Sequence, residues 1–224
     1  MKKIWLPLLA VLLLCACGGE NDRAEELQEQ YQQVSSYETD VRVCVLREDE
    51  TIAYCLHLSA QGDTVRAEVK EPQELAGVGA VLEGERLSLT FDGLVLDVGT
   101  LSPRVSALNC APMLLRAFPK AYLDSFGTET LGGEIVLHVD FSLSSGSEKL
   151  FCSLYFDDAG APVYAEIAEN EKIIAAAEFT NFIFGDSISP NAAQKRAFRF
   201  EAKGWKRLWK ARSNEPGRRS TLTI

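Results

Sequence analysis

Residue types and motifs that commonly carry out catalysis are scarce in this sequence of 224 residues. It has only two histidines, His57 and His138, each alone on a stretch whose pattern favours a β-strand. It contains no G-x-S-x-G motif, no P-loop, no H-E-x-x-H motif and no C-x-x-C pair. Acidic residues are plentiful, but no spacing singles out a catalytic pair. We therefore predict a non-catalytic binding or structural protein with no cofactor or metal site, and both histidines on the exposed face of their strands. A hydrolase with an unrecognised acidic pair is the less favoured alternative.

The apolar run near the N-terminus is too short to cross a membrane. It extends from Ile4 to Leu14, follows Lys2 and Lys3, and is followed by small residues. As a helix it would span about 16 Å, against a hydrocarbon core of about 30 Å. This pattern predicts a secretory signal peptide over residues 1–16.

Two of the six cysteines follow this run directly. Leu14-Cys15-Ala16-Cys17 resembles a bacterial lipobox, in which a small residue precedes the cysteine that becomes the lipidated N-terminus. Ala16 precedes Cys17, whereas the bulky Leu14 precedes Cys15. We predict lipid attachment at Cys17, a tether over residues 17–21, and a location on the extracytoplasmic face of the cell membrane. The alternative is an ordinary signal peptide that leaves Cys17 as a free thiol.

The charges are unevenly distributed along the chain, whose formal net charge is −9. Ten of the 23 basic residues lie between Lys195 and Arg219, whereas 30 of the 32 acidic residues precede residue 191. This distribution predicts an acidic globular body followed by a basic arm. An acidic body binds phosphate backbones poorly, so we expect no nucleic-acid partner.

The body alternates between apolar and polar residues over many short stretches. Asp22 and Glu25 resemble a capping box at the start of a helix, and the pattern changes to a period of two from Val41 onwards. Ser102 and Pro103 predict a further helical region, which Pro112 would divide or kink. Short strands joined by turn residues indicate an antiparallel meander. The fold class is therefore predicted to be α+β, a curved antiparallel sheet with helices on one face.

The first predicted hairpin suggests a register and a disulfide. Pairing Val43 with Leu56, and Val45 with Tyr54, places their apolar side chains on one face. The same register puts Cys44 opposite Cys55 on the other face. This register would allow a cross-strand disulfide, although directly opposed Cβ atoms lie somewhat farther apart than the usual disulfide spacing; two reduced thiols are the alternative. Cys110 and Cys152 have no partner that the sequence assigns, and the alternation around Cys152 indicates a core position.

The order of the elements resembles the lipoprotein-carrier fold of LolA and LolB. Most of the resemblance lies in residues 154–185, LYFDDAGAPVYAEIAENEKIIAAAEFTNFIFG. Residues 34–41, VSSYETDV, are similar to the start of the first strand in germination lipoproteins of spore-forming bacteria. The resemblance covers about residues 22–186. It implies a half-barrel whose apolar concave side is covered by the N-terminal helix and by one or two short helices.

The concave side is the first candidate for a ligand site. Four residues of the first hairpin would line it: Val43, Val45, Leu56 and Leu58. Ala175 and Ala177 are small residues on a strand that normally favours β-branched side chains. They either leave room for a ligand in the concavity or allow a helix to approach the sheet.

The basic arm, residues 187–224, has an amphipathic pattern between residues 195 and 210. On a helical wheel, aromatic residues form one stripe and basic residues fill the remaining arc. This arrangement is typical of a helix that lies on an anionic membrane. The candidate membrane-contact residues are Phe198, Lys203, Trp205, Lys206, Arg207, Trp209 and Lys210. Two alternatives are an arm that lies on the acidic body and a disordered tail without a role.

Two functions follow from these predictions. The first is a lipid-anchored binding protein that holds an acyl chain or a lipoprotein segment in its concave face. The second, implied by the resemblance to germination lipoproteins, is an accessory protein that binds or activates a cell-envelope enzyme, such as a peptidoglycan-modifying enzyme, through its outer surface. The sequence does not distinguish between them.

Overall fold

The computed structural model describes residues 19–47, 50–100, 105–145 and 148–185. Within these ranges, eleven antiparallel strands form one open sheet, with the order β6-β5-β4-β3-β2-β1-β11-β10-β9-β8-β7. The strands are β1 (Ser36–Arg47), β2 (Glu50–Gln61), β3 (Thr64–Glu71), β4 (Gly79–Glu83), β5 (Arg86–Phe91), β6 (Leu94–Thr100), β7 (Leu123–Leu131), β8 (Glu134–Ser145), β9 (Glu148–Phe156), β10 (Pro162–Glu169) and β11 (Lys172–Phe184).

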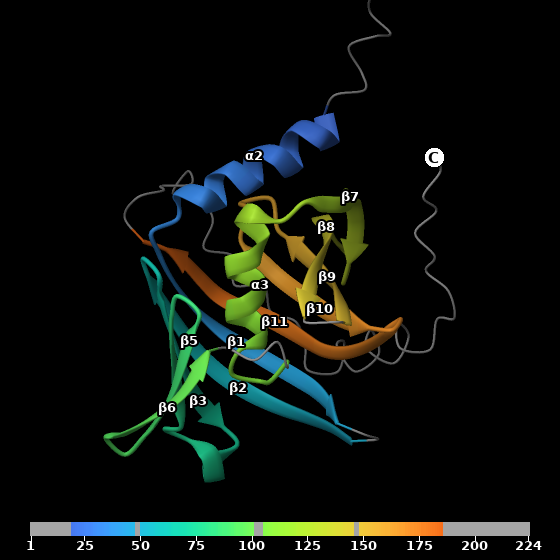
Figure 1. Ribbon diagram of the computed structural model, residues 1–224. Coiled ribbons are helices and arrows are strands. Elements are labelled where there is room, and N and C mark those ends of the chain that lie inside the picture. The colour runs from blue at the N-terminus through green and yellow to red at the C-terminus, as the bar shows by residue number, and fades with distance from the viewer. Residues whose placement is uncertain (1–18, 48–49, 101–104, 146–147, 186–224) are drawn as a thin grey trace, which may run out of the picture.

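The sheet consists of two meanders joined at its centre. One contains β1–β6 and the other β7–β11, and the first strand β1 pairs with the last strand β11. The sheet curves around helix α3 (Cys110–Ala117), which lies on its concave side, and the N-terminal helix α2 (Gly19–Gln33) crosses one end (Figure 1). This is the curved half-barrel, partly covered by helices, that the sequence predicts.

The main core fills the space between the sheet and the helices. Phe118, at the end of α3, is fully buried and packs against Phe156, with ring centroids 5.0 Å apart. Tyr31 of α2 packs edge-on against both rings and donates a hydrogen bond of 2.9 Å to the carbonyl oxygen of Gly160. Burial raises the pKa of Tyr31 well above its ordinary value. These contacts fix α2 to the turn between β9 and β10.

Asp22 and Pro112 occupy positions in their helices that differ from the prediction. Helix α2 starts at Gly19, so Asp22 lies in its first turn instead of capping it. Carboxylates are favoured at both positions, because each lies near the positive end of the helix dipole. Helix α3 starts at Cys110, after Asn109, so Pro112 falls in the first turn and does not break it. Amide groups in the first turn have no partner within the helix, so proline is tolerated there. The predicted helix start at Ser102 and Pro103 lies outside the described residues.

The register of the first hairpin differs from the prediction by two residues. Val43 pairs with Tyr54, and Cys44 pairs with Ala53. Cys55 instead lies opposite Arg42 and donates a hydrogen bond of 3.2 Å to Glu71 Oε2. No disulfide joins Cys44 to Cys55, so the structure agrees with the alternative of two reduced thiols. A shift of two residues keeps every side chain on the same face, and the apolar alternation therefore suits both registers equally well.

Candidate functional site

The concave side is filled by the chain's own side chains at the residues predicted to bind a ligand. Val43, Leu56 and Leu58 have exposed fractions of 0%, 1% and 0%, and Val45 is half-buried. They belong to the same core as Leu114 and Leu115 of α3. The structure thus brings all four together on the predicted face, under a helix and within a packed core.

The two small residues of β11 lie where α3 approaches the sheet. Ala175 pairs with Val45 and Ala177 with Val43, and both alanines are buried in the core. Helix α3 contacts both β1 and β11. This agrees with the prediction that the alanines allow a helix to approach.

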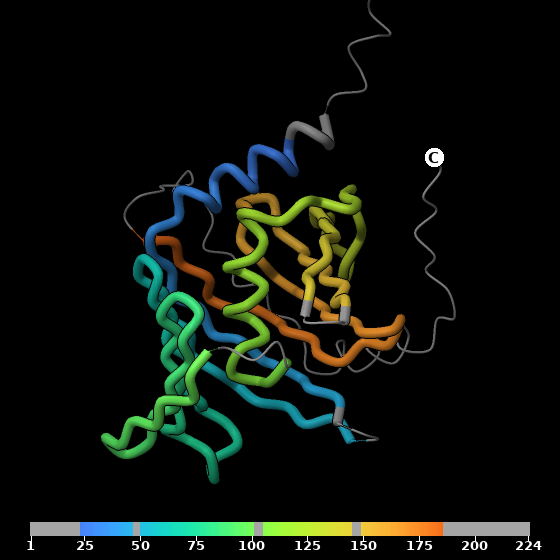
Figure 2. The backbone as a smooth tube through the Cα atoms, viewed as in Figure 1, coloured from blue at the N-terminus to red at the C-terminus, as the bar shows by residue number. Residues whose placement is uncertain are grey.

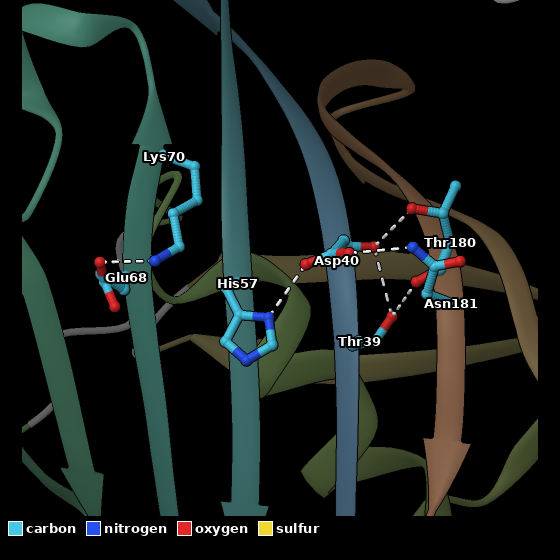
Figure 3. A network of polar contacts seen from close by, with 7 residues as sticks. All are labelled: Thr39, Asp40, His57, Glu68, Lys70, Thr180 and Asn181. Atoms are coloured by element: carbon cyan, nitrogen blue, oxygen red, sulfur yellow. Dashed lines mark hydrogen bonds and ion pairs between the residues drawn. The ribbon is translucent and has the colours of Figure 1, made fainter.

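A polar network occupies the opposite, convex face of the central strands (Figure 3). At its centre, Asp40 of β1 is bound from both sides: His57 Nδ1 lies 2.9 Å from Asp40 Oδ1, and Asn181 Nδ2 donates to Asp40 Oδ2 at 3.0 Å. On β3, Lys70 Nζ donates to Glu68 Oε1 at 2.6 Å. Strands β11, β1 and β2 contribute the side chains around Asp40, and β3 contributes the separate Lys70–Glu68 pair beside them (Figure 3).

An irregularity of β11 positions this network. Glu38 pairs with Ile183 and Asp40 with Thr180, so two residues of β11 lie opposite Thr39. One of them is Asn181, which has a φ of 53°, a left-handed conformation that asparagine adopts more readily than most residues. Thr39 is buried and secures the bulge by donating a 2.9 Å hydrogen bond to the Thr180 carbonyl oxygen.

The side chains around Asp40 change its pKa. Partial burial of Asp40 acts to raise its pKa, but the hydrogen bonds from Asn181 and His57, and the charge of His57, outweigh it. The pKa of Asp40 is therefore below its ordinary value. Half of the carboxylate side chain and 39% of His57 remain exposed, so both can contact a binding partner.

Two hollows share Arg66 and open near this network. The larger has a volume of about 710 Å³; Glu38, Ser59, Arg66 and Ile183 line it together with Tyr37, Ala60 and Phe184, which pack against the main core. The smaller, of about 310 Å³, extends from Arg66 to Glu68 and Thr90. We use the name convex groove for the convex-face residues of the hollows together with the polar side chains beside them: Glu38, Asp40, His57, Ser59, Arg66, Glu68, Lys70, Thr90, Asn181 and Ile183.

A second polar cluster lies on the convex face of the other meander. His138 Nε2 is 2.8 Å from Asp140 Oδ1, and His138 Nδ1 is 3.8 Å from Glu129 Oε2. Ser125 and Ser153 each donate a 2.6 Å hydrogen bond to Asp140. Only 13% of the His138 side chain is exposed. The predicted exposed position is therefore wrong for His138, because Tyr155 and two carboxylates cover it, although it lies on the predicted face.

Sequence reasoning missed the convex groove because of the register. The predicted pairing of Val43 with Leu56 puts Asp40 opposite Ser59, whereas the observed pairing puts Asp40 opposite His57. The two groups lie 17 residues apart in the sequence, and only the correct register brings them together.

The remaining predicted sites lie outside the described residues. These are the lipid-attachment residue Cys17 and the membrane-contact candidates Phe198, Lys203, Trp205, Lys206, Arg207, Trp209 and Lys210. In the part of the chain that the structure describes, no helix is long and apolar enough to cross a membrane. In that same part, no three His, Cys, Asp or Glu side chains are placed to hold a metal ion.

Comparisons with known proteins identify similar folds. No family model and no curated protein matches the chain. A solved LolA-superfamily protein from Nitrosomonas europaea is 11% identical, with a TM-score of 0.40 over 73% of this chain and 94% of that chain. The Mycobacterium tuberculosis lipoprotein LppX is 12% identical, with a TM-score of 0.41 over 78% of this chain and 100% of that chain.

A third similar structure is a complex that contains a lipoprotein. It is that of the CwlD amidase from Clostridioides difficile in complex with the GerS lipoprotein. The match is 19% identical, with a TM-score of 0.32 over 69% of this chain and 88% of that chain. At these identities and scores the similarity concerns the fold.

Proposed function

We propose that the protein is a lipid-anchored accessory protein of the cell envelope that binds a protein partner through its convex groove. The observation that carries the proposal is the contrast between the two faces. The concave residues Val43, Leu56 and Leu58 are buried in the same core as the leucines of α3, whereas the two hollows open beside exposed charged residues of the convex face, Glu38, Arg66 and Glu68.

The chemistry of the convex groove suits a protein surface. Exposed charges of both signs lie side by side, with Arg66 and Lys70 next to Glu38 and Glu68. Alternating charges give an interface its orientation and exclude like-charged partners. The side chains of Glu68 and Lys70 are each 51% exposed, so they can exchange their mutual ion pair for contacts with a partner.

The class of partner comes from the sequence resemblance to germination lipoproteins. That resemblance implies a cell-envelope enzyme, and a peptidoglycan-modifying enzyme in particular. In this proposal the protein does not catalyse a reaction itself; it holds or activates the enzyme at the membrane.

The proposed anchor is a lipid on Cys17, and the basic arm contacts the membrane. Anionic lipid headgroups would attract the basic residues of the arm, including Lys203, Lys206 and Arg207, while Trp205 and Trp209 would insert at the interface. The anchor would hold the body on the extracytoplasmic face, close to the enzyme.

A carrier for an acyl chain or a lipoprotein segment is the function that the concave face was predicted to support. In the observed arrangement that function needs α3 to leave the core, because the buried side chains leave no space at the predicted site. Displacing Leu114 and Leu115 from a packed core is costly without a ligand of similar volume.

One experiment separates the two functions. The full lipidated chain is purified in detergent from its host, together with a variant carrying Arg66→Glu and Lys70→Glu. A matched control carries the same change of charge at exposed residues outside the convex groove, Lys120→Glu and Lys172→Glu. Bound proteins are quantified by mass spectrometry, and lipids that are not covalently attached are extracted with organic solvent.

We expect a peptidoglycan-modifying enzyme to copurify with the wild type and the control and to be lost from the Arg66→Glu, Lys70→Glu variant. Binding of the purified enzyme should weaken at least tenfold in that variant. Equal recovery of the enzyme from both variants, or a stoichiometric acyl lipid with no enzyme, would overturn the proposal.

A further inference from the structure

The two edges of the sheet have opposite chemical character. Edge strand β7 carries Asp124, Ser125 and Glu129, and α2 packs against it. Edge strand β6 instead exposes apolar side chains: Leu94, Val95 and Leu96 have exposed fractions of 73%, 70% and 65%. The β5–β6 hairpin projects away from both helices (Figure 2). So many large apolar side chains on one exposed hairpin mark an interaction surface.

The first residues of strand β6, Leu94 to Leu96, lack the features that normally protect a sheet edge. Among the described strands it pairs only with β5, so its outer side presents backbone N–H and C=O groups. Residues 94–100, LVLDVGT, include neither lysine nor proline. The one irregularity lies at Val98, because Asp97 pairs with Ser88 and Gly99 with Leu87. Residues 94–97 are therefore regularly paired and ready to add another strand.

We propose that β6 pairs antiparallel with β6 of a second copy of this chain, around a two-fold axis through Val95. The sequence Leu94-Val95-Leu96 reads the same in both directions. Pairing around Val95 therefore sets Leu94 of each copy opposite Leu96 of the other, and the two Val95 side chains opposite each other. Such self-complementarity is what a two-fold interface requires.

The face of the sheet on which the leucines lie, and the positions of the charged residues near β6, agree with this pairing. Leu96 pairs with Leu89, whose side chain packs against the main core, so the two leucine pairs would extend the concave side. The pairing sets Asp97 opposite Gly93 of the second copy, and Asp97 already forms an ion pair with Arg86 of its own chain. No two charged side chains oppose each other across the proposed seam.

This inference does not depend on the proposed function. Strand β6 lies at the edge of the sheet, whereas the convex groove centres on β1, β2, β3 and β11. A monomer could still bind the enzyme, and a dimer could still bind none.

Cysteine cross-linking tests the pairing and its register. Val95→Cys, Leu94→Cys and Leu96→Cys are made in the full chain with Cys55→Ser, which removes the partly exposed native thiol. Host membranes are treated with a thiol-specific bridge of about 5 Å, the Cβ separation of directly opposed residues; diagonal neighbours lie about 7–8 Å apart. Ile135→Cys, on an exposed residue of β8, is the control.

We expect a product of twice the protomer mass from Val95→Cys, and from Leu94→Cys with Leu96→Cys expressed together. Little of this cross-linked product should form with Leu94→Cys alone, with Leu96→Cys alone or with Ile135→Cys. In detergent, the wild type should sediment as a dimer, and Val95→Lys should raise the dimer dissociation constant at least tenfold without lowering Tm. Absence of the Val95→Cys product, equal products from all positions, or cross-linking to a different protein would overturn the proposal.

Discussion

The imidazole ring of His138 lies flat against the ring of Tyr155, with centroids 4.6 Å apart and planes 13° apart. Tyr155 is fully buried, so it holds the histidine firmly beside Asp140. Burial acts to raise the pKa of Asp140, but the hydrogen bonds and charge of His138, with the Ser125 and Ser153 hydroxyls, lower it to about 2. The cluster therefore couples the stability of this meander to acid pH.

The first prediction concerns stability at low pH. Asp140 has an ordinary pKa of 3.8 and a pKa of about 2 in the folded chain, so its stabilising effect is complete above about pH 4 and is lost as the pH falls toward 2. Asp140→Asn should lower the free energy of unfolding at pH 7 by about 1–2 kcal/mol, allowing for screening of a partly exposed group. Urea unfolding at several pH values measures this. The difference from wild type should shrink between pH 4 and 2, whereas Asp63→Asn, at an exposed turn, should show none.

The second prediction concerns the core beneath α3. Phe118→Ala removes a fully buried ring that contacts Tyr31, Phe141 and Phe156. It should cost about 3–5 kcal/mol of unfolding free energy, because a cavity replaces a large side chain. Tyr122→Ala, at a position 86% exposed, is the control and should unfold like the wild type. Equal midpoints in chemical denaturation would show that α3 is not packed as described.

The third prediction concerns the thiols. Cys44, Cys55, Cys110 and Cys152 should all be alkylated after denaturation without reductant. In the native protein, Cys55 should react first, because it is partly exposed, whereas burial raises the pKa of Cys110 and Cys152 to about 12. Mass spectrometry of the peptides after increasing reaction times gives the order in which the four thiols are alkylated. If Cys44 and Cys55 became reactive only after reduction, they would be disulfide-bonded.

The fourth prediction concerns the anchor. Cys17→Ala should abolish lipidation, block processing of the signal peptide and move the protein out of the membrane fraction. Cys15→Ala is the matched control and should leave all three unchanged. Retention of the Cys17→Ala protein in membranes after a carbonate wash would contradict the prediction.

The fifth prediction concerns the basic arm. Without its lipid, the protein should cosediment with vesicles of anionic lipid and should lose most of that binding when residues 195–224 are removed. Raising the salt concentration should weaken the binding, since surface charges are screened. Equal binding with and without the arm would show that it does not contact the membrane.

The sequence predicted the faces of the strands better than their partners. Alternation correctly assigned Val43, Leu56 and Leu58 to the concave side. It could not choose between registers two residues apart, and this ambiguity produced both the wrong pairing of Cys44 with Cys55 and the missed contact between Asp40 and His57. Resolving it requires information on the turn between the strands, because turn geometry fixes the register of a hairpin.

The occupancy of the concave side could not be predicted either. The sequence showed apolar residues facing inward, but their number alone does not say whether a ligand or a helix covers them. Ala175 and Ala177 indicated that a helix could approach the sheet closely. Only the position of α3, set by its contacts with β1 and β11, shows that it does.

The pairing of β1 with β11 has a consequence for how the protein folds. Val43 lies against Ala177, so the centre of the sheet joins two strands from opposite ends of the domain. Meanders form from neighbouring strands and can assemble early, but this central seam must wait for the last strand to emerge. Until then one side of β1 lacks its neighbour, and the half-finished sheet can pair with other chains. The pairing of β1 with β11 is therefore the contact that closes the sheet, and it is the most distant along the chain.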